Sequence, residues 1–393
     1  MTREIKAQSR LRRWLVLLPL ALLLAGLCGC QTLGFYTQAI KGEYQLFAHQ
    51  QPVEKLLADT NTPLEVRTQL ETLTNLLAFA KSDLGLPADD NYSKYVELHR
   101  KFVVWDVEAA PEFSMKAKSW WYPVVGRLEY RGYFSQRGAT NYAAFLERKG
   151  YDVFVAGVEA YSTLGWFKDP ALSSFISEPA PDLAELIFHE LGHKELFARG
   201  DEDFNEAFAT TVGEEGARRW LRAKGDQTAY DQYEAELGRT WQFVHLVATA
   251  RKRLQELYGD EVTPQGRIKA SAKPPLPVTR MREEKLKIFT QMRQDYARLK
   301  VEWGGNPDYD AWFARRLNNA QLNSVAAYYD YVPGFARLLE QSHGQLPEFY
   351  HAAARLARMP KAARHERLSA LGRAMAEPLG HKNGQPDSTA AGE

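Results

Sequence analysis

The sequence predicts an α+β protein that is mostly helical, with a small mixed sheet beside a central helix and helical extensions around both. Most of the chain carries apolar residues three and four positions apart, which is typical of amphipathic helices. Between Tyr122 and Ser162 the pattern changes to short runs of β-branched and aromatic residues, which indicate strands. The 393 residues, of which 45% are hydrophobic, can bury the core of one large domain or of two closely packed ones.

The charges nearly cancel. Lysine and arginine together number 50, and aspartate and glutamate 49, so the formal net charge is +1. Such a balance creates no global field toward a polyanion. We therefore expect no nucleic-acid partner.

Residues 1–29 have the pattern of an export signal. Basic residues precede an apolar run from Trp14 to Leu27. This run is short for a membrane-spanning helix, which needs about 20 apolar residues. An uncleaved anchor helix is the alternative. We expect the signal to be removed, leaving one main domain over residues 30–376.

The run ends in Leu27-Cys28-Gly29-Cys30, which resembles the lipobox of bacterial lipoproteins. The resemblance implies cleavage before Cys30 and diacylation of its sulfur, so the membrane becomes a partner through a lipid anchor. Gln31 in the next position resembles outer-membrane sorting. Together these features imply a cell-envelope lipoprotein, on the outer membrane of a Gram-negative bacterium and facing the periplasm.

The next elements follow from periodicity. We expect a helical scaffold over residues 31–118, then strands at Val124 to Phe134 and at Tyr151 to Tyr161, with a helix at Ala139 to Lys149 between them. Odd and even positions of the second strand differ in polarity, which suits a sheet edge beside a cleft. Such an edge can align an extended peptide by strand addition.

A capped helix is expected at Leu183 to Ala198, with Asp182 as N-cap and Gly200 after its end. A second helix begins near Phe204. The remaining segments are two long amphipathic stretches, a Pro-rich linker and a disordered tail: Ala217 to Tyr258 with a break at Gly225, Arg282 to Trp303, Thr263 to Pro277, and residues 377–393.

The capped helix carries His189, Glu190 and His193. A helix advances 3.6 residues per turn, so the two histidines lie on one face and can bind a single ion, while Glu190 lies beside it as a general base. Zinc needs a further protein ligand and an open position for water, and Glu206 on the following helix can supply the ligand. We therefore predict a Zn²⁺ site.

Other readings of these residues remain open. The two histidines can instead be buried in a helical core, with their ring nitrogens hydrogen-bonded and no metal bound. Glu206 can instead serve the N-terminus of its own helix, because Asp203 and Glu206 have the spacing of a capping box. Neighbouring carboxylates compete for the role of ligand: Asp201, Glu202, Asp203, Glu214 and Glu215. The turn at Gly200 favours a solvent-facing position for Asp201, Glu202 and Asp203.

The histidine helix followed by Asn205-Glu206-x-x-Ala209 resembles the gluzincin aminopeptidases. Further blocks resemble a bacterial family of predicted aminopeptidases, many of them lipoproteins: Tyr130 to Phe134, Ala160 to Phe167, Asp169-Pro170, Phe188 to His193, Phe204 to Ala209, and Asn318 to Ala320. The likeness covers most of the mature chain. It implies a zincin-like metallopeptidase in which His189, His193 and Glu206 bind zinc.

Two features depart from the gluzincin pattern. Fewer residues separate His193 from Glu206 than in the better-known gluzincin aminopeptidases, and no motif of the kind that holds a free substrate amine is found. An endopeptidase acting on envelope proteins or cell-wall peptides therefore stays open beside the aminopeptidase. A non-catalytic envelope assembly or binding lipoprotein is the third reading.

The expected reaction is peptide hydrolysis by a zinc-activated water, with Glu190 moving the proton toward the leaving amine. The oxyanion needs a donor from the protein. Tyr161, Tyr133 and Tyr130 are the candidates, because they precede the helix on the predicted strands; each can equally be a tyrosine packed at a sheet. The residues that bind substrate side chains are not predicted.

Overall fold

The computed structural model describes residues 30–89, 91–122, 126–160, 169–263, 267–272 and 275–376. It is 61% helical with small mixed sheets, which confirms the predicted α+β class. The predicted signal segment, the predicted disordered tail and Tyr161 lie outside the described residues.

The central sheet has three antiparallel strands in the order β6-β3-β7: Tyr130–Tyr133, Val104–Pro111 and Tyr151–Val158. The prediction of helix over residues 31–118 is wrong for β3, the middle strand. Its burial alternates because Val107 is buried while Asp106 and Glu108 are partly exposed, which is the two-residue period of a strand. The second predicted strand, β7, is indeed an edge of this sheet.

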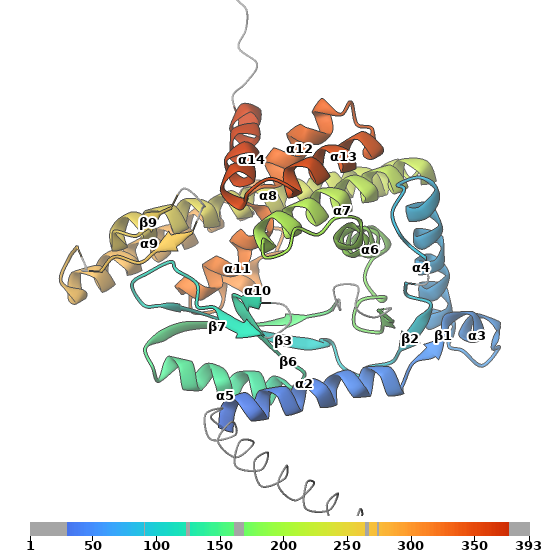
Figure 1. Ribbon diagram of the computed structural model, residues 1–393, viewed down its shortest axis with the longest axis horizontal. Coiled ribbons are helices and arrows are strands. Elements are labelled where there is room, and N and C mark those ends of the chain that lie inside the picture. The colour runs from blue at the N-terminus through green and yellow to red at the C-terminus, as the bar shows by residue number, and fades with distance from the viewer. Residues whose placement is uncertain are drawn as a thin grey trace, which may run out of the picture.

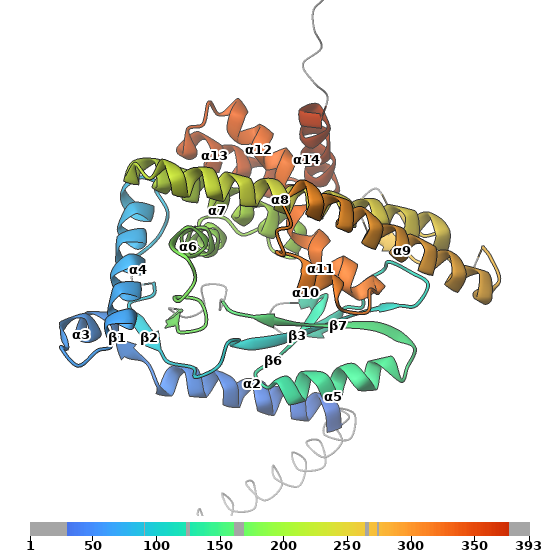
Figure 2. The same ribbon diagram turned by 180° about the vertical axis from the view of Figure 1, so that it is seen from behind.

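One face of the sheet packs on α5, Gln136–Glu147, whose N-cap Ser135 accepts a hydrogen bond from the Gly138 amide. The core between them contains Val107, Tyr133 and Tyr142. The first helix, α2 (Cys30–Ala48), contributes Phe35 to the same core. Figures 1 and 2 show α2 and α5 on one side of the sheet and α6 and α7 on the other.

The helix of the histidines is α6, Ala180–Glu195. It begins three residues before the predicted start because Pro179, not Asp182, is its N-cap, and Pro181 fits in the first turn, where no amide is needed. It ends three residues before the predicted end. Its apolar side packs in the largest core with the helix α4, Leu64–Ser82.

The helix of Glu206 is α7, Glu202–Lys224, and it makes the most extensive helix contact of the chain with α6. It ends at Gly225, which has a φ of +68°, and α8 (Gln227–Tyr258) follows. The predicted break at Gly225 is therefore confirmed. The predicted amphipathic helix near Arg282 is α9, Val278–Glu302, and it packs against α8.

Shorter elements complete the fold. Part of the predicted Pro-rich linker forms the hairpin of β9 and β10, Glu261–Val262 and Ile268–Lys269. Other short strands form a sheet in the order β1-β2-β8 and a hairpin of β4 with β5: Gln51–Pro52, Lys94–Val96, Ala171–Leu172, Trp120–Tyr122 and Gly126–Leu128. The remaining helices are α3 and α10 to α14: Val53–Ala58, Asp310–Phe313, Asn319–Tyr329, Val332–Gln341, Leu346–Ala357 and Lys361–Ala376.

The segment at Asn318 and Asn319 fastens α11 to the sheet. The fully buried Asn319 side chain donates to the carbonyl oxygens of Pro111, Glu112 and Ser114. Asn318 donates to the carbonyl oxygen of Val153. These bonds satisfy main-chain acceptors at the end of β3 and along β7, so this block of the sequence has a structural role.

None of the helices in the described ranges combines the length and the apolar character needed to cross a membrane.

Candidate metal centre

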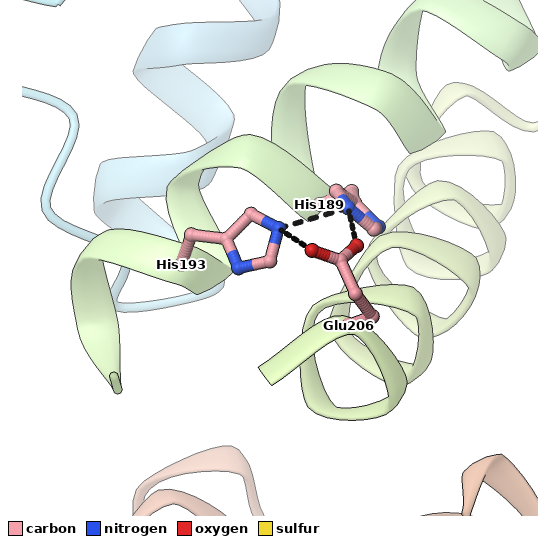
Figure 3. Close-up of side chains that lie close together, drawn as sticks. All are labelled: His189, His193 and Glu206. Carbon is pink, nitrogen blue, oxygen red and sulfur yellow. Dashed lines mark hydrogen bonds and ion pairs between the residues drawn. The ribbon is translucent and has the colours of Figure 1, made fainter. Parts of the chain in front are cut away.

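His189, His193 and Glu206 converge at the crossing of α6 and α7 (Figure 3). The Nε2 atoms of the two histidines lie 3.1 Å apart. The carboxylate of Glu206 lies between the rings, with Oε2 3.5 Å from Nε2 of His189 and Oε1 3.6 Å from Nε2 of His193. Two turns of one helix and one residue of the next thus present three ligand atoms to a single point.

The spacing of these atoms fits a tetrahedral ion. Zinc binds histidine nitrogen and carboxylate oxygen at about 2.0–2.1 Å, so two ligand atoms at tetrahedral positions lie about 3.3 Å apart. The observed separations of 3.1, 3.5 and 3.6 Å bracket that value. The donor set of two imidazoles and one carboxylate is also one that zinc takes in catalytic sites, where the fourth position stays open.

His189, His193 and Glu206 are largely buried, so their charged forms are stabilised mainly by one another. Burial alone would raise the pKa of the Glu206 carboxyl, but hydrogen bonds with His189 and His193 hold it well below its usual range. Burial likewise opposes a charge on His189, yet the neighbouring Glu206 raises the pKa of this imidazole on balance. The carboxylate form of Glu206 is the form that binds a metal.

Glycines allow the two helices to come close enough. A Cβ atom at Gly192 of α6 would lie 3.2 Å from the Cα of Ala209 on α7. A Cβ atom at Gly213 of α7 would lie only 2.8 Å from the carbonyl oxygen of Glu185 on α6. Because the backbones touch at both points, the Glu206 carboxylate can reach the imidazoles.

Asn205 fixes the short connection between α6 and α7. Its Oδ1 accepts from the amide of Ala198 at 2.7 Å, and its Nδ2 donates to the carbonyl oxygen of the same residue at 3.1 Å. The side chain is 3% exposed. The helix α7 therefore starts in a fixed orientation, in which Glu206 is turned toward the histidines and not toward the N-terminus at Asp201.

Glu190 lies beside the group, as its position in the helix predicts. Among the described residues its buried Oε2 has no hydrogen-bond partner. Burial raises the pKa of this carboxyl, and the nearby His189 and His193 lower it in part. A buried acceptor without a protein partner is suited to bind a proton from a small molecule at the metal centre.

A further set of polar residues supports the end of α6. Lys194 follows His193 directly and pairs with Asp169 at 3.5 Å and with the side chain of Asn91. Asp169 is 2% exposed, and its carbonyl oxygen accepts from the amide of Tyr92. Tyr92 has a φ of +55°, which is costly for a bulky residue and is held here by that bond.

Behind the first turn of α6, Glu185 accepts a hydrogen bond from Tyr233 of α8 at 2.6 Å. Glu185 stands one helical turn before His189 and contributes to the raised pKa of that imidazole. Burial raises the pKa of Glu185 itself. On α7, burial and the nearby Glu185 carboxyl together raise the pKa of Glu214 to about 8. The two helices therefore share a buried acidic layer under the metal centre.

The structure contains a second group of acidic and histidine side chains, formed by Asp201, Asp203 and His365. Asp201 is 1% exposed, so the prediction that it faces solvent is wrong. Its carboxylate accepts from His365 at 2.8 Å and pairs with Lys361 at 2.9 Å and Arg364 at 3.1 Å. Burial alone would raise the pKa of Asp201, but these partners lower it. Cations from α14 already neutralise this carboxylate, so the group is an ion-pair network that holds the start of α7.

The sheet contributes two carboxylates that the sequence analysis missed. Asp106 and Glu108 of β3 point away from the α5 face, because Val107 and Ala109 of the same strand pack on that face. Burial raises the pKa of Asp106 to about 7, and burial with Asp106 and Glu202 raises that of Glu108. Burial with Glu206 raises the pKa of Glu202 to about 8. Acidic groups of the sheet therefore influence Glu202 of α7, and Glu202 in turn is influenced by the metal-ligating Glu206.

The tyrosine candidates separate by strand register. Tyr133 pairs opposite Trp105 and is buried in the core between the sheet and α5, away from the metal-ligating group. Tyr130 pairs opposite Glu108, so its side chain shares the face that is turned toward α7. The edge of β7 is partly covered, because Arg315 and Asn318 donate to the carbonyl oxygens of Val155 and Val153.

Comparison with known proteins gives one family. A family model described as "Putative aminopeptidase" matches residues 34–368, which include every residue of the metal centre. No curated protein and no solved structure matches the chain.

Proposed function

The chain belongs to the family described as "Putative aminopeptidase", and from this premise we propose that it is a zinc-dependent aminopeptidase of the gluzincin type. One observation carries the proposal: the ligand atoms of His189, His193 and Glu206 are 3.1 to 3.6 Å apart, as the corners of a tetrahedral zinc site are. Bound there, zinc would supply Lewis-acid activation of a water molecule near neutral pH.

Glu190 is the general base in this proposal. Its buried Oε2, which bonds to no other described residue, would accept a proton from the attacking water and pass it to the leaving amine. The pKa of Glu190 is raised from its ordinary value by burial, which favours a carboxyl that both takes and returns the proton. Tyr130, on the sheet face turned toward α7, is the candidate donor to the oxyanion.

The acidic residues near the centre favour a substrate with a free N-terminus. The α-amino group of a peptide is a cation at neutral pH and requires an anionic partner. Burial raises the pKa of the carboxyls of Asp106, Glu108 and Glu202, so each holds its proton until an amine binds beside it and takes that proton, which would leave a carboxylate paired with an ammonium group. An endopeptidase would not need carboxylates there, because an internal peptide segment carries no charge on its backbone.

We propose further that the protein is anchored in the cell envelope through lipid on Cys30, with its catalytic domain in the periplasm. The support is the sequence Leu27-Cys28-Gly29-Cys30 after an apolar run.

The test combines metal analysis with sequencing of cleavage products. The purified protein is expected to contain zinc and to remove single residues from the N-termini of a peptide library, and a zinc chelator should abolish cleavage until zinc is restored. Internal cleavage products would show an endopeptidase. Bound zinc without any cleavage, with and without chelator, would show a non-catalytic binding or assembly protein.

A further inference from the structure

The helix α2 presents apolar residues on two different sides. One side packs on the protein: Phe35 and Leu46 are buried, and Gln38 bonds to the main chain of β6 and of Phe134. These contacts fix the orientation of the helix against the sheet. Its outer side is therefore also fixed.

The outer side carries Tyr36, Ile40 and Tyr44, which are four residues apart and so form one line along the helix. Ile40 and Tyr44 are 70% and 71% exposed, and Tyr36 is 36% exposed. Single exposed apolar residues are normal on a protein surface. A line of them along one helix, about 12 Å long at 1.5 Å per residue, marks an interaction surface.

The hairpin of β4 and β5 lies next to the start of this helix, because Tyr122 packs on Phe35 with ring centroids 5.9 Å apart. Its Trp121 is 63% exposed and lies directly opposite Arg127, which is also exposed. Tyrosine, tryptophan and arginine are the residues that proteins place at the level of lipid headgroups. The exposed residues of α2 and of the neighbouring hairpin thus have a composition that fits a membrane interface better than an apolar protein interface.

The position of α2 in the chain indicates what its outer side binds. The helix begins three residues after the apolar run Trp14 to Leu27. Whether the anchor is that run or lipid on Cys30, the first turn of α2 is held at the membrane. At 1.5 Å per residue, Tyr36 is about 9 Å and Tyr44 about 21 Å from Cys30 along the helix, so a helix lying flat brings the whole line into the bilayer surface.

We propose that α2 lies in the interface of a phospholipid bilayer, with Tyr36, Ile40 and Tyr44 inserted and Trp121 and Arg127 at the headgroups. The inference rests on the proposed N-terminal anchor and not on the proposed catalytic activity. Figures 1 and 2 show the sheet between α2 and the metal-ligating helix α6. The protein docked in this way turns the metal centre away from the membrane, toward soluble peptides.

The experiment uses the chain from residue 30 onward, which holds every described element, with Cys30→Ser so that no lipid is attached. Vesicles of phosphatidylethanolamine and phosphatidylglycerol are floated through a density gradient with the protein. We expect the parent protein to float with the vesicles. Ile40→Glu and Tyr44→Glu should each lower the bound fraction at equal lipid about tenfold, because an inserted side chain becomes charged. Val301→Glu is the matched control, because Val301 is a 79% exposed apolar residue of the distant helix α9.

Three outcomes would overturn the proposal: a parent protein that does not float, equal effects of Ile40→Glu and Val301→Glu, or a dimer in light scattering that Ile40→Glu dissociates without any binding to vesicles. The last outcome would assign the surface to a second copy of the chain. Thermal unfolding of all variants checks that exposed substitutions leave the fold intact. A second readout is an environment-sensitive dye on Tyr44→Cys, which should shift to the blue with vesicles, whereas the same dye on Lys41→Cys of the same helix should shift less.

Discussion

Gly213 of α7 rests on His189 of α6: a Cβ atom built on the glycine would lie 3.1 Å from the Cβ of the histidine and 3.3 Å from its amide nitrogen. The nearest atom of all would be the carbonyl oxygen of Glu185, at 2.8 Å. Helix backbone cannot give way as a flexible side chain can. The distance between the two ligand-bearing helices is therefore set at this glycine.

Gly213→Ala should weaken metal binding because it forces α7 and its Glu206 away from the imidazoles. Overpacking should lower the stability by about 1–3 kcal/mol. The higher helix propensity of alanine should offset up to about 1 kcal/mol of this loss. Gly238→Ala in α8 is the control: nothing lies within 4 Å of its added Cβ, so it should stabilise slightly. Zinc titration and denaturant unfolding of both variants measure the effect, and equal zinc affinities would contradict it.

Glu190→Gln should keep zinc and lose turnover. The amide has nearly the shape of the carboxyl but cannot take a proton, so kcat should fall at least about hundredfold. Glu206→Gln should instead lose zinc, since its carboxylate is a ligand atom in the proposed site. Glu202→Gln, one turn earlier on the same helix, should retain it. Metal content and rate measured on the same samples separate ligand from base; an active Glu190→Gln would remove Glu190 from the mechanism.

Glu108→Gln should raise KM for peptides with a free N-terminus by about tenfold, because the amide, unlike the carboxyl, cannot give its proton to the amine and become its anionic partner. Peptides with an acetylated N-terminus should show no such difference between wild type and variant. Glu147→Gln, at an exposed position on α5, is the control. If both peptide classes respond equally to Glu108→Gln, the carboxylate has another role.

The stability of the metal-free protein should depend on pH through Glu214. Burial raises the pKa of this carboxyl from 4.5 to about 8 in the folded state. The folded state thus keeps a proton that the unfolded chain releases, so this stabilisation is complete below pH 4.5 and is lost as the pH rises toward 8. Each carboxyl of this kind contributes up to roughly 1.4 kcal/mol per pH unit.

Glu214→Gln stays neutral in both states, so the free energy of unfolding of the variant should rise relative to wild type between pH 5 and pH 8. Guanidinium unfolding at several pH values in the presence of chelator measures this difference. Glu340→Gln on the surface of α12 should give a difference that is flat with pH. A flat difference for Glu214→Gln as well would show that its carboxyl ionises in the folded protein.

The histidine helix was predictable because its signal is local. His189 and His193 share a face by helical period alone, and a short turn brings the next helix back, so Glu206 could be named before its contacts were known. The sheet was harder. In β3 the acidic residues Asp106 and Glu108 alternate with buried Val107, but the strand lies within a stretch whose overall apolar spacing is helical, and this spacing predicts helix there.

Strand register decides which face of the sheet Tyr130 and Tyr133 occupy, and register depends on residues far away in the sequence. Tyr130 and Tyr133 stand three positions apart on one strand and therefore point to opposite faces. Which face meets the histidines depends on how β6 pairs with β3, more than twenty residues earlier in the chain. The start of α6 was misplaced for a different reason: Asp182 has the chemistry of an N-cap, but Pro179 already ends the extended chain.

The ion pairs of Asp201 form late in the synthesis of the chain. Its partners Lys361, Arg364 and His365 belong to the last described helix, and His365 follows Asp201 by 164 residues. A growing chain presents the histidine helix long before these residues. Asn205 can orient the start of α7 early, but the buried charge of Asp201 is neutralised only when residues 361–365 have been synthesised, so the polar support of the Glu206 helix is completed late in folding.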